Sequence, residues 1–156
     1  MNSRGMYTVV VSAVASPAAA FDFLELVAAA DKPVEICRIR IGQTSEPTTE
    51  EEQLRLTILR NQSTSGSGGS TPTPRLLNPS DGAAAFTAET MNTTVATGGS
   101  PHTLFEDAMN IRAGYDMAFA PEERPMTTNA AGRLVLTCSA PADAITFDAT
   151  FWVKEL

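Results

Sequence analysis

The residues that could do chemistry are few and lie far apart in the chain. His102 is the only histidine, and it stands between a proline and a threonine in a polar stretch. A nucleophilic triad would need His102 as its sole base, with a serine or cysteine nucleophile and an orienting carboxylate. The sequence contains neither a Gly-x-Ser-x-Gly elbow nor a reactive-cysteine motif. We therefore interpret His102 as a surface histidine and expect a protein without catalytic residues.

Metal and cofactor sites find equally little support. Cys37 and Cys138 are the only cysteines, and the local alternation predicts that both face inward. We interpret them as small buried hydrophobic side chains rather than as a disulfide. One histidine and two distant cysteines do not supply the clustered ligands that zinc needs. No Asp-x-Asp-x-Asp-Gly calcium loop occurs, and the glycine-rich run 66–69 lacks the Lys-Ser or Lys-Thr of a phosphate loop. We expect no metal and no cofactor.

Charge restricts the partners. Eighteen acidic residues against eleven basic ones give a formal net charge of -7, which disfavours nucleic acid because phosphates are repelled. No spacing singles out a pair of carboxylates as a glycosidase would require. The arginines are scattered among acidic residues, so only the fold could gather some of them into a patch. With no membrane-length apolar run and no leader-like start, we expect no membrane partner and folding in a reducing cytosol.

Hydrophobic alternation identifies the elements that would position these residues. It is clearest over 145–153, where apolar side chains occupy every odd position, as in a strand with one buried face. We expect this terminal strand to be structurally essential and to pair in antiparallel fashion with a strand over 133–138. Further strands are predicted over 7–14, 34–41, 54–60, 86–91, 104–110 and 115–119.

Two segments depart from simple alternation. In 34–41 the apolar positions change face in mid-strand, which predicts a β-bulge or a bend. In 16–30 Ser16 and Pro17 could start a helix that the alanines favour, whereas the alternation of 21–26 favours a strand, which we prefer. Thr49 and Glu52 have the spacing of a capping box, so one helical turn before Leu54 is an open alternative.

The connections complete the predicted architecture. Residues 61–82 form a long Gly/Pro-rich loop or arm, because such a composition cannot form a packed core of its own. About eight strands with short connections predict one mainly-β domain over 1–156, with a possible N-terminal arm at 1–6. The expected fold is an antiparallel β-sandwich of the jelly-roll kind, ahead of an immunoglobulin-like arrangement or a closed barrel.

An outward aromatic residue is the first candidate for an interface. Trp152 falls on the outward face of the terminal strand, where a large aromatic side chain is either an anchor for a partner or part of a second buried layer. We name Trp152 a possible partner-interface residue, together with Arg75, Leu76 and Leu77 at the end of the long loop.

Parts of the chain resemble a group of small structural proteins of tailed bacteriophages. The resemblance is carried by EQLR at 52–55, GSGGSTPTP at 66–74, LNP at 77–79, FEDAMNIRAG at 105–114, PEERP at 121–125, GRLVL at 132–136 and APADA at 140–144. It implies a non-enzymatic virion protein, made in the host cytoplasm, of the capsid decoration or cement kind.

The resemblance also implies partners. A decoration protein binds the outside of the head and stabilises contacts between copies of the major capsid protein, and it acts as a homo-oligomer, with a trimer favoured. Two alternatives stay open: a head-tail connector or tail component, and a carbohydrate-binding module of a tail or fibre.

Overall fold

The computed structural model describes residues 5–45, 52–128 and 132–156. Over these ranges the regular structure consists of β-strands and one short 3-10 helix, η1, and the predicted mainly-β class is confirmed. The elements are β1 (Met6–Ala15), β2 (Phe21–Val27), β3 (Val34–Gln43), β4 (Gln53–Arg60), β5 (Arg75–Leu76), β6 (Thr87–Asn92), β7 (His102–Asn110), β8 (Tyr115–Ala118), η1 (Pro121–Glu123), β9 (Arg133–Cys138) and β10 (Thr146–Glu155).

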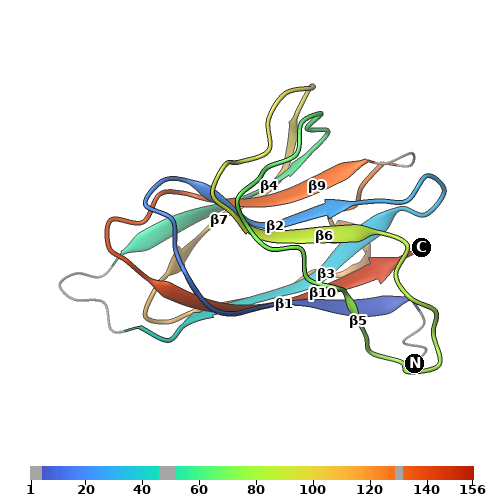
Figure 1. Cartoon of the computed structure of the whole chain (residues 1–156), viewed down its shortest axis with the longest axis horizontal. Helices are drawn as coiled ribbons and strands as arrows, with labels where there is room; N and C mark the ends of the chain where they lie inside the picture. The colour runs from blue at the N-terminus through green and yellow to red at the C-terminus, as the bar shows by residue number, and fades with distance from the viewer. Residues whose placement is uncertain (1–4, 46–51, 129–131) are drawn as a thin grey trace.

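The strands form two antiparallel sheets packed face to face, as Figure 1 shows. Sheet A has the order β5-β1-β10-β3-β8, and sheet B has the order β6-β2-β9-β4-β7. Without β5 and β6, the eight remaining strands have the arrangement of a jelly roll. The predicted β-sandwich is therefore confirmed.

The predicted pairing of the last two long strands is wrong. β10 lies between β1 and β3 in sheet A, whereas β9 lies between β2 and β4 in sheet B. The connection between them therefore crosses from one sheet to the other instead of closing a hairpin. Alternation shows which face of a strand is buried, but it does not show which neighbour the strand pairs with.

The core lies between the sheets and follows the alternation closely. Four odd-numbered residues of β10, from Phe147 to Val153, are buried, and the even-numbered ones face outward. Phe23 of sheet B lies 4.7 Å from Phe21 and 4.9 Å from Phe147 between ring centres, both in edge-on packing. Aromatic pairs in this geometry contribute on the order of 0.5–1.5 kcal/mol beyond the area that they bury.

The bulge predicted in 34–41 is confirmed. Trp152 pairs with Arg38 and Val153 pairs with Ile36, so Cys37 is the extra residue. The bulge keeps the isoleucines on either side of it in the core, and it turns Cys37 to the outer face of sheet A, where its thiol lies 3.9 Å from the Met6 sulfur. The inward placement predicted for Cys37 is wrong, although the side chain is buried. Cys138 does lie in the core.

The ambiguous segment 16–30 contains strand β2 and no helix. A register shift between Asp22 and Leu24 makes Phe23 an extra residue of this strand. The shift lets β2 bury large side chains over most of its length, a gain that a short helix on the surface would not offer.

The segment 61–101 between β4 and β7, which we call the insertion, contains β5 and β6 and is bonded to β2 of sheet B through Ser65, Gly66 and Ala96. Within the insertion, backbone bridges join Thr64 to Thr97, Ser67 to Thr94 and Ser70 to Thr90 of β6, while β5 pairs with β1 in sheet A. The predicted loop over 61–82 is thus a surface loop bonded along the sandwich rather than a free arm. Of the possible arm at 1–6, Met6 already belongs to β1, and residues 1–4 lie outside the described ranges, as does Thr49.

Glycine is needed where the first part of the insertion approaches β6 and the residues that follow it. A Cβ atom at Gly66 would lie 2.6 Å from the backbone oxygen of Thr94, and one at Gly69 would overlap that of Thr90. Only a residue without a side chain permits this contact. The glycines of the run 66–69 therefore let the loop pack closely, which differs from the role of a phosphate loop.

Candidate interaction surface

The sequence offers one histidine and two cysteines as candidates for catalysis or metal binding. His102 is the first residue of β7 and is exposed. Both cysteines are free and buried, and burial raises the pKa of Cys37 to about 11 and that of Cys138 to about 12. Their thiols therefore stay protonated and weakly nucleophilic at neutral pH. Among the described residues, no three His, Cys, Asp or Glu side chains lie close enough to hold a metal ion.

Asp22 and Glu25 are two buried carboxylates on the outer face of β2. Asp22 accepts a hydrogen bond from the backbone N–H of Ala96 at 2.7 Å and another from the Thr137 hydroxyl at 2.7 Å. Burial raises the pKa of Asp22 to about 6, and the hydrogen bonds and nearby Glu25 modify that shift. Because Ala96 belongs to the insertion, this carboxylate ties the insertion to sheet B.

Glu25 also attaches the insertion to sheet B, through a larger number of hydrogen bonds than Asp22 makes. Its carboxylate accepts hydrogen bonds from Arg133 at 2.6 Å, from the Ser65 hydroxyl at 2.6 Å and from the backbone N–H of Gly66 at 2.9 Å. A buried charge is tolerated when it is paired and hydrogen-bonded in this way. Both carboxylates thus attach the insertion to sheet B. The insertion covers part of the outer face of this sheet, where Val135 is fully buried.

The outer face of sheet A is more open, and its outward-facing side chains stand in cross-strand rows. One row runs from Arg75 through Thr8 and Trp152 to Arg38. The next row runs from Val10 through Thr150 and Arg40 to Asp116. We call this surface, made by residues of β5, β1, β10, β3 and β8, the open face.

An aromatic residue on the open face is held in place by an ion pair. The guanidinium of Arg38 donates to both carboxylate oxygens of Asp116, at 2.8 and 2.6 Å. The same guanidinium lies 5.1 Å from the centre of the Trp152 ring. Arg38 lowers the pKa of Asp116, mainly through this hydrogen bonding, so the pair stays charged at neutral pH. A side chain held by such a contact loses less conformational entropy when a partner binds.

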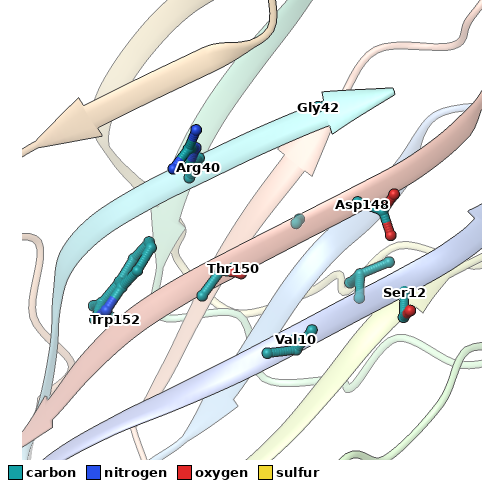
Figure 2. Close-up of a pocket in the computed structure, with 9 residues that line it drawn as sticks. Val10, Ser12, Arg40, Gly42, Asp148, Thr150 and Trp152 are labelled. Atoms are coloured by element: carbon teal, nitrogen blue, oxygen red, sulfur yellow. The ribbon is translucent and has the colours of Figure 1, made fainter. Parts of the chain in front are cut away.

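A shallow groove of about 500 Å³ crosses the open face beside Trp152, as Figure 2 shows. Its lining includes Val10 and Ser12 of β1, Asp148 and Thr150 of β10, and Arg40 and Gly42 of β3. Past Arg40 and Gly42 the groove continues into a smaller hollow of about 260 Å³ bounded by Tyr115 and Asp116. Asp148 is fixed at one end by a 2.8 Å hydrogen bond from the Ala13 N–H.

The structure brings together three of the four residues proposed for an interface. Trp152 and Arg75 stand in one row, and Leu77 follows β5 at the same edge of the sheet with 45% of its surface exposed. Leu76 is different, because it pairs with the buried Tyr7 and packs against the core. Trp152 is partly exposed, with the guanidinium of Arg38 over its ring.

Sequence reasoning missed the charged part of this face. Arg38, Arg40 and Asp116 lie next to one another only because β3 pairs with β8. The alternation within 34–41 indicates that these arginines point outward, which is a usable signal. It does not show that Trp152 of a distant strand lies beside them.

Comparisons with protein-family models, with curated proteins and with solved structures found no match. In the described part of the chain, no helix is long and apolar enough to cross a membrane.

Proposed function

We propose that this chain is a non-enzymatic binding protein that attaches to another protein through its open face. The observation that carries the proposal is Trp152, a partly exposed aromatic side chain fixed by Arg38 beside a groove. Tryptophan and arginine are the residue types most often found at the energetic centres of protein interfaces. Sheet B offers less free surface over β2 and β9, because the insertion is bonded across it.

The particular form of the proposal is a capsid decoration protein. The resemblance to tailed-bacteriophage structural proteins supports it, and jelly rolls are frequent in capsid proteins. The partners would be the major capsid protein on the outer head surface and further copies of this chain, with a trimer favoured. Fold alone does not define a function, so this part of the proposal depends on the resemblance.

Co-sedimentation of the full chain with purified, expanded phage heads tests the proposal. We expect saturable binding that Trp152→Ala weakens at least tenfold. Leu104→Ala is the matched control, because Leu104 is also a partly exposed apolar residue, on β7 of the other sheet, and its loss should leave binding unchanged. Cryo-electron microscopy of the saturated heads would then show density at the head surface. Density only at the connector would contradict decoration, and so would the absence of saturable binding to heads.

A carbohydrate-binding module of a tail or fibre is the second candidate. Trp152 beside Asp148 in a shallow groove is the feature that favours it, because sugars stack on aromatic rings and bind carboxylates. Arg38, which lies over the ring, disfavours it. A glycan array probed with the full chain distinguishes the two candidates, since a set of related glycans that loses binding with Trp152→Ala would support the module.

A further inference from the structure

The open face carries several cationic side chains that form no salt bridge within the described ranges, although the protein is acidic overall. Arg40 and Arg75 form no salt bridge with any residue that the structure describes, whereas Arg38 is neutralised by Asp116. Lys154 stands on the same face, two residues beyond Trp152. In a chain with a net charge of -7, this surface is a local exception that favours an anionic partner.

The groove offers both apolar and cationic side chains to such a partner. Val10, with 47% of its surface exposed, and Trp152 provide apolar walls, and Arg40 stands between the groove and the smaller hollow. Gly42 leaves the floor open, because a Cβ atom there would meet no atom within 4 Å. Apolar side chains would fit against the walls and a carboxylate would fit on Arg40.

Building on the proposed function, we propose that this groove binds an extended segment of the partner protein in which one Asp or Glu is flanked by apolar side chains. The guanidinium of Arg40 would hold that carboxylate through paired charge-assisted hydrogen bonds. The neighbouring side chains of the segment would cover Val10 and Trp152. Removing the water around this ion pair strengthens it.

The charges on either side of Arg40 favour a peptide over a continuous polyanion. Asp148 lies at one end of the groove and Asp116 bounds the hollow beyond Arg40. Adjacent strands are about 4.8 Å apart, so a phosphate chain that reached Arg40 would also approach these carboxylates and be repelled. A segment with a single carboxylate meets less of that repulsion, because the groups on either side of the carboxylate are uncharged.

The test follows the fluorescence of Trp152, which is the only tryptophan of the chain and lies beside the groove. An array of synthetic peptides with one central Asp and varied Leu, Val, Ala and Phe neighbours is probed with the full chain. The strongest binder is then titrated in solution while Trp152 fluorescence is followed, beside the same peptide with Asn in place of Asp. We expect saturable binding that falls about tenfold or more with the Asn peptide, and that weakens as salt increases.

Two variants locate the site and one serves as the control. Arg40→Gln should weaken the Asp peptide at least tenfold and leave the Asn peptide unchanged. Gly42→Leu should abolish binding of both peptides by filling the groove. The fold should be retained, because a Cβ atom at position 42 would meet no atom within 4 Å. Arg55→Gln changes an exposed arginine of β4 in sheet B and should have no effect. Thermal melting of each variant confirms folding.

The outcomes separate this inference from the proposed function. The inference is overturned if no peptide of the array gives saturable binding, if Asp and Asn peptides bind equally, or if single-stranded DNA or heparin oligosaccharide binds the groove more tightly than any peptide. If heads still bind the wild type and Trp152→Ala weakens that binding, the decoration role stands and only the acidic segment is wrong. If peptides bind and heads do not, the groove chemistry stands and the decoration role is wrong.

Discussion

The guanidinium of Arg38 is shared between Trp152 and Asp116. Its central carbon lies 5.1 Å from the middle of the indole ring, and two of its nitrogens donate to the Asp116 carboxylate. The three residues come from β3, β10 and β8, so the contact depends on the middle and edge of sheet A being assembled. Asp116 acts on Trp152 only through Arg38 and is a positioning residue.

Asp116→Ala should therefore loosen Trp152 without unfolding the protein. Arg38 would lose its anchor and leave the ring more often, so we expect faster quenching of Trp152 fluorescence by acrylamide. The melting temperature should change little, because ion pairs in contact with water contribute little to stability. Arg55→Ala serves as the control. Unchanged quenching in Asp116→Ala would show that the indole is held by other contacts.

Asp22 should make folding stability depend on pH in an unusual direction. Its pKa is raised to about 6 in the folded protein, from the ordinary value of 3.8. Between these values the folded state binds the proton that the unfolded state has released, so this contribution is complete below about pH 4 and is lost as the pH rises through 6. We expect the wild type to lose about 1–2 kcal/mol of unfolding free energy relative to Asp22→Asn between pH 5 and pH 7.5.

Urea denaturation of both proteins at several pH values measures that difference. The two proteins are compared by how their unfolding free energies change with pH. The Asp22→Asn substitution also alters the hydrogen bonds to Ala96 and Thr137, and this changes the unfolding free energy by an amount that does not depend on pH. Parallel pH profiles for the two proteins would show that Asp22 titrates normally.

Removing Arg133 should destabilise the protein more than removing its whole ion pair. Arg133→Met leaves the Glu25 charge buried beside the insertion with only Ser65, Asn92 and a backbone N–H as donors, and we expect a loss of roughly 3–5 kcal/mol. The double variant Glu25→Met with Arg133→Met removes both charges and should recover part of that loss. Urea denaturation of the two variants decides the point. A double variant less stable than Arg133→Met would contradict this account.

Asp107 should protect the exposed edge of sheet B. It pairs with the buried Leu56 and so lies on the inward side of β7, where it accepts hydrogen bonds from the Tyr115 hydroxyl and the Ala108 N–H. An inward charge on an edge strand prevents another strand from adding to the sheet. Asp107→Val should cause concentration-dependent association in light scattering, while Asp107→Glu keeps the charge and should behave like the wild type.

Much of the secondary structure could be predicted because alternation is a local property. The odd-numbered residues 145–153 indicate a strand with one buried face, and no other part of the chain is needed for that inference. The bulge at Cys37 was predictable for the same reason, since two apolar faces within one strand can both be buried only by inserting a residue.

The partners of each strand could not be predicted in this way. The segments 133–138 and 145–153 look like a hairpin, yet they lie in different sheets because the best burial for each is beside strands far away in sequence. The sequence also did not predict that the insertion covers part of sheet B. In the sequence, Asp22 and Glu25 resemble ordinary outward-facing residues of a strand, and only the fold brings the insertion over them.

The sequence by itself therefore determined most of the strands, most of their buried faces and the mainly-β class, because burial of alternate side chains is read within a few residues. Only the tertiary structure decided that Trp152, Arg38, Arg40 and Arg75 share one face beside a groove. Those residues come from three strands separated by up to 114 positions of sequence between Arg38 and Trp152. Their proximity is a property of strand order, which depends on how all the strands together bury their apolar surface.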